Sequence, residues 1–389
     1  MVRLGEIFTI ASGGTPDKKK SSYYMGGTIP WVKTGDLKGQ YVAEGVECIT
    51  EEGLNNSSAK LFPPNTVLLA MYGATIGACS ILHYEASTNQ ACAAFLPNEK
   101  VLPTYLYYFL LSKKDQFVSD GVGGAQPNIS GGYLKNVQFD LIPLEQQKAI
   151  AARMDKVAEL IALRKEQLAK LDQLVKSRFI ELFGDPFDNK KWDTQKLRNI
   201  SVSISDGSNV DKAYYQEKGD VLFLRIQNVW FNEFRLDDSV YISEDINNEY
   251  LDTSLHHGDL LITKIGRYYT KDSSLGRVSV YLGEDDKANY SNNIMRVRLT
   301  DEVCSEFVNV LMNLDDYNRY IREVSVGGTD KRALSKAIIG DLPIIMPPKE
   351  LQIEYLEFVK QIDKSKLAIQ QSLDKLELLK KSLMQEYFG

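Results

Sequence analysis

The stretches EQQKAIAARMDKVAELIALRKEQLAKLDQLVKSRFIELFG (residues 145–184) and ELQIEYLEFVKQIDKSKLAIQQSLDKLELLKKSLMQEYFG (residues 350–389) follow one pattern. They lie 205 residues apart, so the ending KSRFIELFG at 176–184 aligns with KSLMQEYFG at 381–389. Each stretch comes after a longer segment rich in predicted strands. The chain therefore consists of two similar heads, each followed by a similar helix. We expect it to present two related surfaces at a fixed separation.

Apolar residues in both stretches recur in alternating steps of three and four, which is the heptad pattern of a coiled coil. Each stretch begins shortly after a proline, Pro143 or Pro348, and Gly184 followed by Asp185 and Pro186 is a helix stop. About 40 residues at roughly 1.5 Å each predict a rod of about 60 Å. We expect antiparallel pairing within one chain; a coiled coil between two copies is the alternative. The predicted seam consists of Met154, Val157, Ile161, Leu168, Leu171, Val175, Val359, Ile362, Ile369, Leu373, Leu376 and Leu383.

Further residues on these helices have an expected role beside the seam. Arg164, Lys366 and Lys380 occupy heptad positions, where a cation marks register or partner choice. Additional apolar residues are expected to widen the packed face: Leu160, Leu163, Leu174, Phe358 and Leu379.

The two heads share an order of elements although their side chains diverge. In this alignment VRLGEI (2–7), IPWVKTGDL (29–37), NTVLLAMYG (65–73), TNQ (88–90) and GGAQPNI (123–129) correspond to QKLRNI (195–200), VLFLRIQNV (221–229), GDLLITKIG (258–266), SNN (291–293) and GGTDKRA (327–333). The first four segments read as strands or turns, and a single helix is expected in each head before the last, at 104–117 and 305–320. One scaffold with two different recognition surfaces accounts for this pattern.

Composition limits the classes of function. Hydrophobic residues make up 43% and charged residues 25% of the 389 residues, as in folded proteins. Residues 144–183 carry eight basic and six acidic side chains and residues 349–389 carry seven of each, so the heads account for about −8 of the net charge of −6. A protein that held DNA alone would usually be basic. We therefore expect any DNA binding to occur inside a larger complex.

The sequence contains no recognisable catalytic motif. It lacks the phosphate-binding pattern GxxxxGK[ST], and DPF at 185–187 lacks the second proline of an amino-methyltransferase motif. The three histidines and four cysteines have no metal-ligand spacing, and no apolar run approaches the ~20 residues of a membrane span. These observations predict a non-enzymatic protein without a metal centre, in a reducing cytoplasm.

Five segments together resemble the specificity (S) subunit of type I restriction-modification systems. They are IPWVKTGD (29–36), GATIG (73–77), TNQA (88–91), GGAQPNIS (123–130) and IPLEQQ (142–147). The resemblance covers the whole chain. In the second head the alignment departs from it, with QN for GD at 227–228, NN for NQ at 292–293 and KRAL for PNIS at 331–334.

The resemblance implies an α+β fold with two tandem target-recognition domains, which are β-rich heads with helices. Two long helices would join them as an intramolecular antiparallel coiled coil with pseudo-twofold symmetry. The implied domains are target-recognition domain 1 (1–143), the central helix (144–184), target-recognition domain 2 (185–347) and the distal helix (348–389).

The resemblance also implies a role and partners. A non-catalytic subunit would read a bipartite, asymmetric sequence in double-stranded DNA, one half-site per head, while the helices set the spacer. Two methyltransferase subunits would dock on it, and two restriction subunits could join them. S-adenosylmethionine would be bound by the methyltransferase partner, and ATP and Mg by the restriction partner.

Polar and aromatic residues in the loops are the candidate DNA contacts, because base edges are read by Arg, Lys, Asn and Gln. They are Lys33, Thr34, Tyr72, Thr75, Gln90, Gln126 and Asn128 in the first head, and Arg225, Gln227, Asn228, Lys264, Arg267, Tyr268, Tyr269, Lys271, Lys331 and Arg332 in the second. The alternative for residues such as Gln90 and Gln126 is that they satisfy backbone groups in turns. The alternative for the whole protein is a two-headed adaptor that binds proteins rather than DNA, which the acidic heads would suit.

Overall fold

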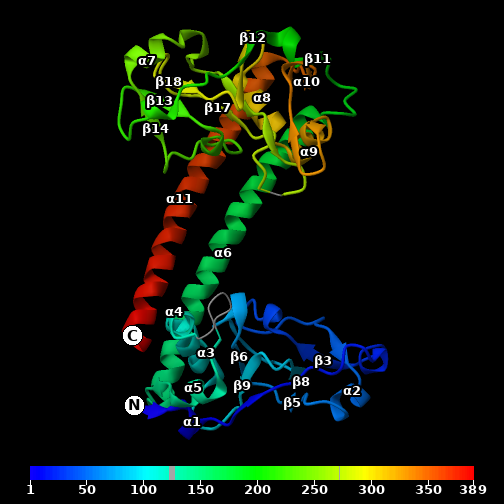
Figure 1. Ribbon diagram of the computed structural model, residues 1–389, viewed down its shortest axis with the longest axis vertical. Helices are drawn as coiled ribbons and strands as arrows, with labels where there is room; N and C mark the ends of the chain where they lie inside the picture. Colours follow the sequence, from blue (N-terminus) through cyan, green and yellow to red (C-terminus); the bar gives the residue numbers. More distant parts are fainter. Residues whose placement is uncertain (122–127, 271) are drawn as a thin grey trace. The chain divides into compact units, whose positions relative to one another are not determined.

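The computed structural model describes residues 1–121, 128–270 and 272–389 (Figure 1). The chain forms two compact units, each of which contains one head and part of both long helices. Unit 1 comprises Met1–Gln167 and Ile369–Gly389, and unit 2 comprises Leu168–Ala368. With 42% helix and 21% strand, the fold is mixed as predicted.

Head 1 is built on two four-stranded sheets in the orders β2-β9-β6-β7 and β4-β3-β8-β5, with a small β1-β10 pair. Its strands are β1 (Val2–Arg3), β2 (Ile10–Ser12), β3 (Ile29–Val32), β4 (Cys48–Ile49), β5 (Leu61–Phe62), β6 (Val67–Ala70), β7 (Cys79–Ile81), β8 (Ala86–Thr88), β9 (Cys92–Phe95) and β10 (Gln138–Phe139). Its helices are α1 (Leu4–Ile7), α2 (Glu51–Asn55), α3 (Pro103–Ser112), α4 (Lys114–Ser119) and α5 (Gly131–Asn136).

Head 2 repeats this plan with sheets β12-β19-β15-β17 and β14-β13-β18, a β11-β22 pair and a three-stranded sheet β16-β21-β20. Its strands are β11 (Thr194–Lys196), β12 (Ser201–Asp206), β13 (Val221–Leu224), β14 (Val240–Ile242), β15 (Leu260–Thr263), β16 (Ile265–Arg267), β17 (Val278–Val280), β18 (Ala288–Tyr290), β19 (Ile294–Leu299), β20 (Val326–Gly327), β21 (Lys331–Ala333) and β22 (Pro343–Ile345). Its helices are α7 (Glu244–Asn248), α8 (Ser305–Met312), α9 (Asp315–Glu323) and α10 (Lys336–Gly340).

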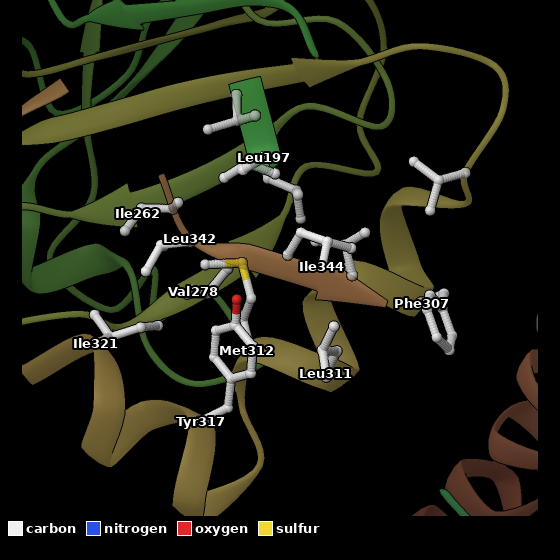
Figure 2. Close-up of a cluster of buried hydrophobic side chains, with 14 of the residues drawn as sticks. Leu197, Ile262, Val278, Phe307, Leu311, Met312, Tyr317, Ile321, Leu342 and Ile344 are labelled. Atoms are coloured by element: carbon white, nitrogen blue, oxygen red, sulfur yellow. The ribbon is translucent and has the colours of Figure 1, made fainter. Parts of the chain in front are cut away.

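Each core lies between a sheet and the helices that follow it. In head 2 the buried cluster joins Ile262 and Val278 of the sheet to Phe307 and Leu311 of α8 (Figure 2). Strands with every residue buried, such as β15, suit this interior position. Burial of such apolar side chains contributes about 1.5–3 kcal/mol each, which makes this core the main source of the unit's stability.

Two 40-residue helices, α6 (Leu144–Phe183) and α11 (Lys349–Phe388), occupy the repeated heptad stretches. α6 ends at Gly184, which has a φ of 78° and donates its N–H to Ile180 O at 2.8 Å. Within the described residues, no helix combines the length and apolar character that a bilayer span requires.

The two long helices run antiparallel, as interhelical contacts in each unit show. In unit 1 the Nζ of Lys165 lies 2.9 Å from Glu377, and in unit 2 the Nζ of Lys366 lies 2.7 Å from Asp172. Lys366 therefore forms an interhelical pair at its heptad position. Arg164 instead donates to Gln167 of its own helix at 2.7 Å.

Burial along α6 and α11 follows the heptad. The predicted seam residues are all buried or half-buried, with Met154, Val157 and Leu373 the most enclosed. The expectation of a wider packed face is wrong for Leu163, Leu174 and Leu379, which are 44–45% exposed. Each long helix covers its partner only along the narrow seam, so residues beside it remain in solvent.

The prediction of one helix in the middle of each head is also wrong, because two shorter helices are present. In head 1 the break between α3 and α4 falls at Lys113, and in head 2 Asn313 and Leu314 separate α8 from α9. The Asn313 side chain donates to Val278 O at 3.0 Å, which ties the break to the sheet. Tyr105, in the helix expected to be core, is buried as predicted.

Candidate nucleic-acid interface

In head 1, backbone hydrogen bonds bring four segments far apart in the sequence to one edge of the fold. β3 and β8 run parallel, so the segments that follow them leave the sheet at the same edge. Asn89 N donates to Val32 O at 2.9 Å, Met71 N donates to Ala91 O at 2.9 Å, and Ile129 N donates to Met71 O at 3.0 Å. The ends of β3, β6 and β8 and the segment before α5 are therefore adjacent.

Head 2 contains the same three hydrogen bonds. Ser291 N donates to Leu224 O, Lys264 N donates to Asn293 O, and Leu334 N donates to Lys264 O, each at 2.9 Å. We call this side of each head its loop edge. It comprises residues 33–36, 72–75, 89–91 and 128–130 in head 1, and residues 225–228, 265–270, 291–293 and 331–334 in head 2.

Strand register corrects the sequence alignment of the two heads at two places. Val32 lies opposite Thr88 and Leu224 opposite Tyr290, so TNQ at 88–90 corresponds to YSN at 290–292 rather than to SNN. Ser130 and Ser335 also correspond, because each caps the next helix by accepting from a backbone N–H, at 3.1 and 3.2 Å. Alignment by residue type had misplaced both by one position.

A hollow of about 430 Å³ lies at the loop edge of head 2, and residues from all four segments line it. They include Ile226, Arg267, Asn293 and Lys331. The four segments thus form one continuous surface, as a recognition site assembled from loops requires.

Comparison with known proteins agrees with this arrangement. Residues 1–173 match the family model for the type I restriction modification DNA specificity domain. The MjaVIII specificity subunit of Methanocaldococcus jannaschii aligns over 99% of this chain and 90% of its own length, at 22% identity. The chain is therefore similar to the specificity subunits of type I restriction-modification systems.

Two further similarities concern a part of the chain and its fold. The MjaIX specificity subunit of the same archaeon is 29% identical over 249 residues, which cover 58% of this chain and 57% of the relative. That match therefore spans little more than half of the relative's length. The crystal structure of the type I S subunit from M. genitalium shares the fold, with a TM-score of 0.56 at 14% identity, covering 100% of this chain and 95% of that chain.

In head 1 some of the predicted contact residues already bond to other side chains of the protein, and others are exposed. Lys33 lies 2.6 Å from Glu47, and this hydrogen bond raises the pKa of the Lys33 ammonium. Gln90 is exposed and accepts a hydrogen bond from the Thr15 hydroxyl. Tyr72 is 43% exposed.

The other head 1 candidates lie beside these residues. Thr34 begins the short turn after β3, and Thr75 donates its hydroxyl to Tyr72 O at 3.3 Å. Asn128 is exposed and forms a β-bridge with Tyr72. Gln126 lies outside the described residues, as does Lys271 in head 2.

Three head 2 candidates converge on one carboxylate that the sequence did not single out. Asp238 accepts hydrogen bonds from Gln227 at 3.2 Å and from Asn228 at 2.9 Å, and Arg225 lies 3.2 Å from it. The Gln227 hydrogen bond, with the nearby Arg225 charge, lowers the pKa of Asp238. Asn228 is fully buried, so in this conformation it shapes the turn and does not reach a base edge.

The remaining head 2 candidates lie on or beside the sheet β16-β21-β20. Lys264 is largely covered and pairs with Asp206. Arg332 stacks on the Tyr268 ring, with its guanidinium carbon 3.9 Å from the ring centroid. Tyr269 is 77% exposed, and Arg267 and Lys331 lie opposite each other in the register.

A tryptophan near this edge was missed by sequence reasoning. The guanidinium carbons of Arg235 and Arg277 lie over the Trp230 ring, 3.4 and 3.7 Å from its centroids. Burial lowers the pKa of Arg277, whose Nε also donates to Ser273 O at 2.9 Å. This stack fixes the loop after β13 against the segment before β17, and no periodicity in the sequence signals such a contact.

Two observations on the described part of the chain concern metal binding and thiol reactivity. No cluster of three or more His, Cys, Asp or Glu side chains there could hold a metal ion. Burial raises the pKa of the Cys92 thiol to about 12, which keeps it protonated and unreactive near neutral pH.

Proposed function

We propose that this chain is the non-catalytic DNA-specificity subunit of a type I restriction-modification complex. Each head reads one half of a bipartite, asymmetric target in double-stranded DNA. The observation that carries this proposal is the repeated set of three backbone hydrogen bonds at the two loop edges. It holds four segments in the same arrangement in both heads while their side chains differ, as two readers of different half-sites require.

In this proposal the recognition domains are residues 1–143 and 185–347, and the helices at 144–184 and 348–389 set the spacer. The helices also offer docking surface, because Leu163, Leu174 and Leu379 are exposed on them beside the seam. Two copies of a methyltransferase subunit suit the internal repeat, since each would meet one of two equivalent surfaces.

In this proposal the partner subunits carry out the methylation and cleavage of DNA. The methyltransferase subunits bind S-adenosylmethionine, and two restriction subunits, which use ATP and Mg, could complete the complex. The whole assembly acts on DNA in the cytoplasm. The acidic balance of the heads supports this division, because phosphate neutralisation supplies most non-specific affinity and a partner must contribute it.

A domain exchange tests the proposal. Residues 1–143 are replaced by the corresponding head of another specificity subunit, and the chimera is expressed with the methyltransferase partner. Sequencing of methylated genomic DNA should show one half-site changed and the other intact. A chimera that alters both half-sites would contradict the two-reader model.

A salt titration separates this function from that of an adaptor. The chain alone and its complex with the methyltransferase are titrated with a target duplex at increasing salt. We expect a strong decrease in affinity with salt for the complex, since phosphate contacts release counterions. An absence of DNA binding by the complex at every salt concentration would instead support a protein-binding adaptor.

A further inference from the structure

The sheet β16-β21-β20 of head 2 has one open face. Ile265 lies opposite Ala333 and Arg267 opposite Lys331 in the register of β16 and β21, and Val326 of β20 lies opposite Ala333. Residues opposite each other or two apart on a strand point to the same face. One face therefore carries two cations and three apolar residues.

The other face is covered by the protein itself. It carries Gly266 and Arg332, which lie opposite each other. A Cβ placed on Gly266 would lie 2.4 Å from Leu275 N, so the backbone there is packed directly against the segment before β17. The Arg332 guanidinium is stacked on Tyr268. Only the first face is free to meet a ligand.

The apolar side chains on the open face are unusually exposed to solvent. Val326 is 58% exposed and Ile265 is 38% exposed, although both are apolar. The Arg267 side chain is 63% exposed, and the carboxylate paired with it, that of Asp330, lies 3.9 Å away. Lys331 has no ion pair among the described residues. Two available cations beside two exposed aliphatic side chains, in a head of acidic balance, indicate an anionic ligand with apolar features.

We infer that this open face enters the major groove of the half-site read by head 2, with Arg267 contacting a guanine. The inference rests on the proposed function and adds which element reads the DNA, through which groove and at which base. A major groove about 12 Å wide admits a β-ribbon, and Arg or Lys bonds O6 and N7 of guanine. Ile265 and Val326 match thymine methyl groups in the same groove.

The spacing of the two cations suits neighbouring base pairs. Opposite residues of an antiparallel pair have Cα atoms about 4.5–5.5 Å apart, and long side chains easily converge to the 3.4 Å rise of one DNA strand. The described residues of head 1 have only the Tyr72–Asn128 bridge at the equivalent place.

The test compares Arg267→Ala and Lys331→Ala with Lys287→Ala in the complex with the methyltransferase. Lys287 is an exposed cation that immediately precedes β18, at the opposite end of that strand from the loop edge, so the control removes the same charge elsewhere. Methylated motifs are determined on a random-sequence plasmid library. Arg267→Ala should lower the preference for guanine at one position of the second half-site by about tenfold or more, while the first half-site stays unchanged.

A modified duplex identifies the groove. Replacing that guanine by 7-deazaguanine removes N7 from the major groove, and replacing it by inosine removes the amino group from the minor groove. Wild-type binding should fall about tenfold or more with 7-deazaguanine only, and Arg267→Ala should be insensitive to it.

The outcomes separate the inference from the proposed function. A wild-type complex without any sequence preference would contradict the proposed function itself. A specific wild-type complex whose second half-site is unaffected by Arg267→Ala and Lys331→Ala, or is sensitive only to inosine, would overturn the ribbon assignment alone. Thermal unfolding of each variant should match the wild type, because both side chains are exposed.

Discussion

Gln147 and Gln352, which lie 205 residues apart, accept equivalent hydrogen bonds from their own heads. Both are fully buried in the first turns of α6 and α11. The Oε1 of Gln147 accepts from Leu102 N, and that of Gln352 accepts from Cys304 N, each at 2.9 Å. Because Leu102 and Cys304 are the N-cap residues of α3 and α8, each glutamine joins a long helix to one of these helices in its own head.

Removing either glutamine should destabilise its own unit. Gln147→Ala leaves the partly buried Leu102 N–H and the carbonyls of Lys100 and Ile142 without the Gln147 side chain as partner. The expected loss is about 2–3 kcal/mol, since an unsatisfied buried group costs about 1–3 kcal/mol. Gln352→Ala should cause a similar loss in unit 2. Urea unfolding followed by a probe in each unit measures both.

The matched control for this prediction is Gln146→Ala. Gln146 is the exposed neighbour, and its substitution should change stability by less than about 0.5 kcal/mol. Equal effects of the two alanine variants would show that Gln147 contributes no specific hydrogen bonds.

A second prediction concerns the seam. Met154 is fully buried against the core of head 1, so Met154→Ala should cost about 2–5 kcal/mol through lost burial and a cavity. Leu163→Ala removes an apolar side chain of similar size that is 45% exposed, and it should cost less than about 0.5 kcal/mol. Chemical denaturation of the chain alone distinguishes them, and a comparable loss for Leu163→Ala would place that residue in the seam.

The heptads were strong predictors because a helix of 40 residues repeats its pattern many times. The alignment of the heads failed where it relied on residue type: Ser291 resembles Thr88, but strand register aligns Asn89 with Ser291. The breaks at Lys113 and Asn313 carry no Pro or Gly and depend on tertiary contacts.

The candidate site was predictable to a similar extent. The sequence located the segments that form the loop edges, because a strand followed by polar residues is a local signal. It could not show that Arg225, Gln227 and Asn228 are held by Asp238, ten or more residues further on, because that bond exists only once the loop closes. The sequence therefore identified candidate cations but not the carboxylates that pair with them in the folded protein.

A third prediction follows from this loop. Asp238→Asn removes the charge that holds Arg225, so sequence preference at the second half-site should change while the first half-site is kept. Asp237→Asn makes the same change of net charge at the adjacent exposed residue. Motif sequencing with the methyltransferase partner measures both. Identical motifs for the two variants would exclude a role of the loop network in recognition.

The pH dependence of this network has a defined sign. The folded-state pKa of Asp238 is lowered, mainly by the Gln227 hydrogen bond, so the stabilisation is present above the unfolded value of about 3.9. It is lost as pH falls through the lower folded value. Between pH 5 and 8 the wild-type preference at the second half-site should therefore be constant. A change of preference within that range would point to another titrating group.

The last prediction concerns the helices as the spacer. The boundary between the two units crosses α6 after Gln167 and α11 after Ala368, away from both heads. One heptad inserted at each point preserves the seam and lengthens both helices by roughly 10 Å, the rise of about three base pairs. We expect the methylated motif to retain both half-sites and to gain spacer base pairs. A heptad in only one helix is the control, because unequal lengths shift the seam register and should reduce methylation without creating a new spacer. If the paired insertion left the spacer unchanged, the helices would not set it.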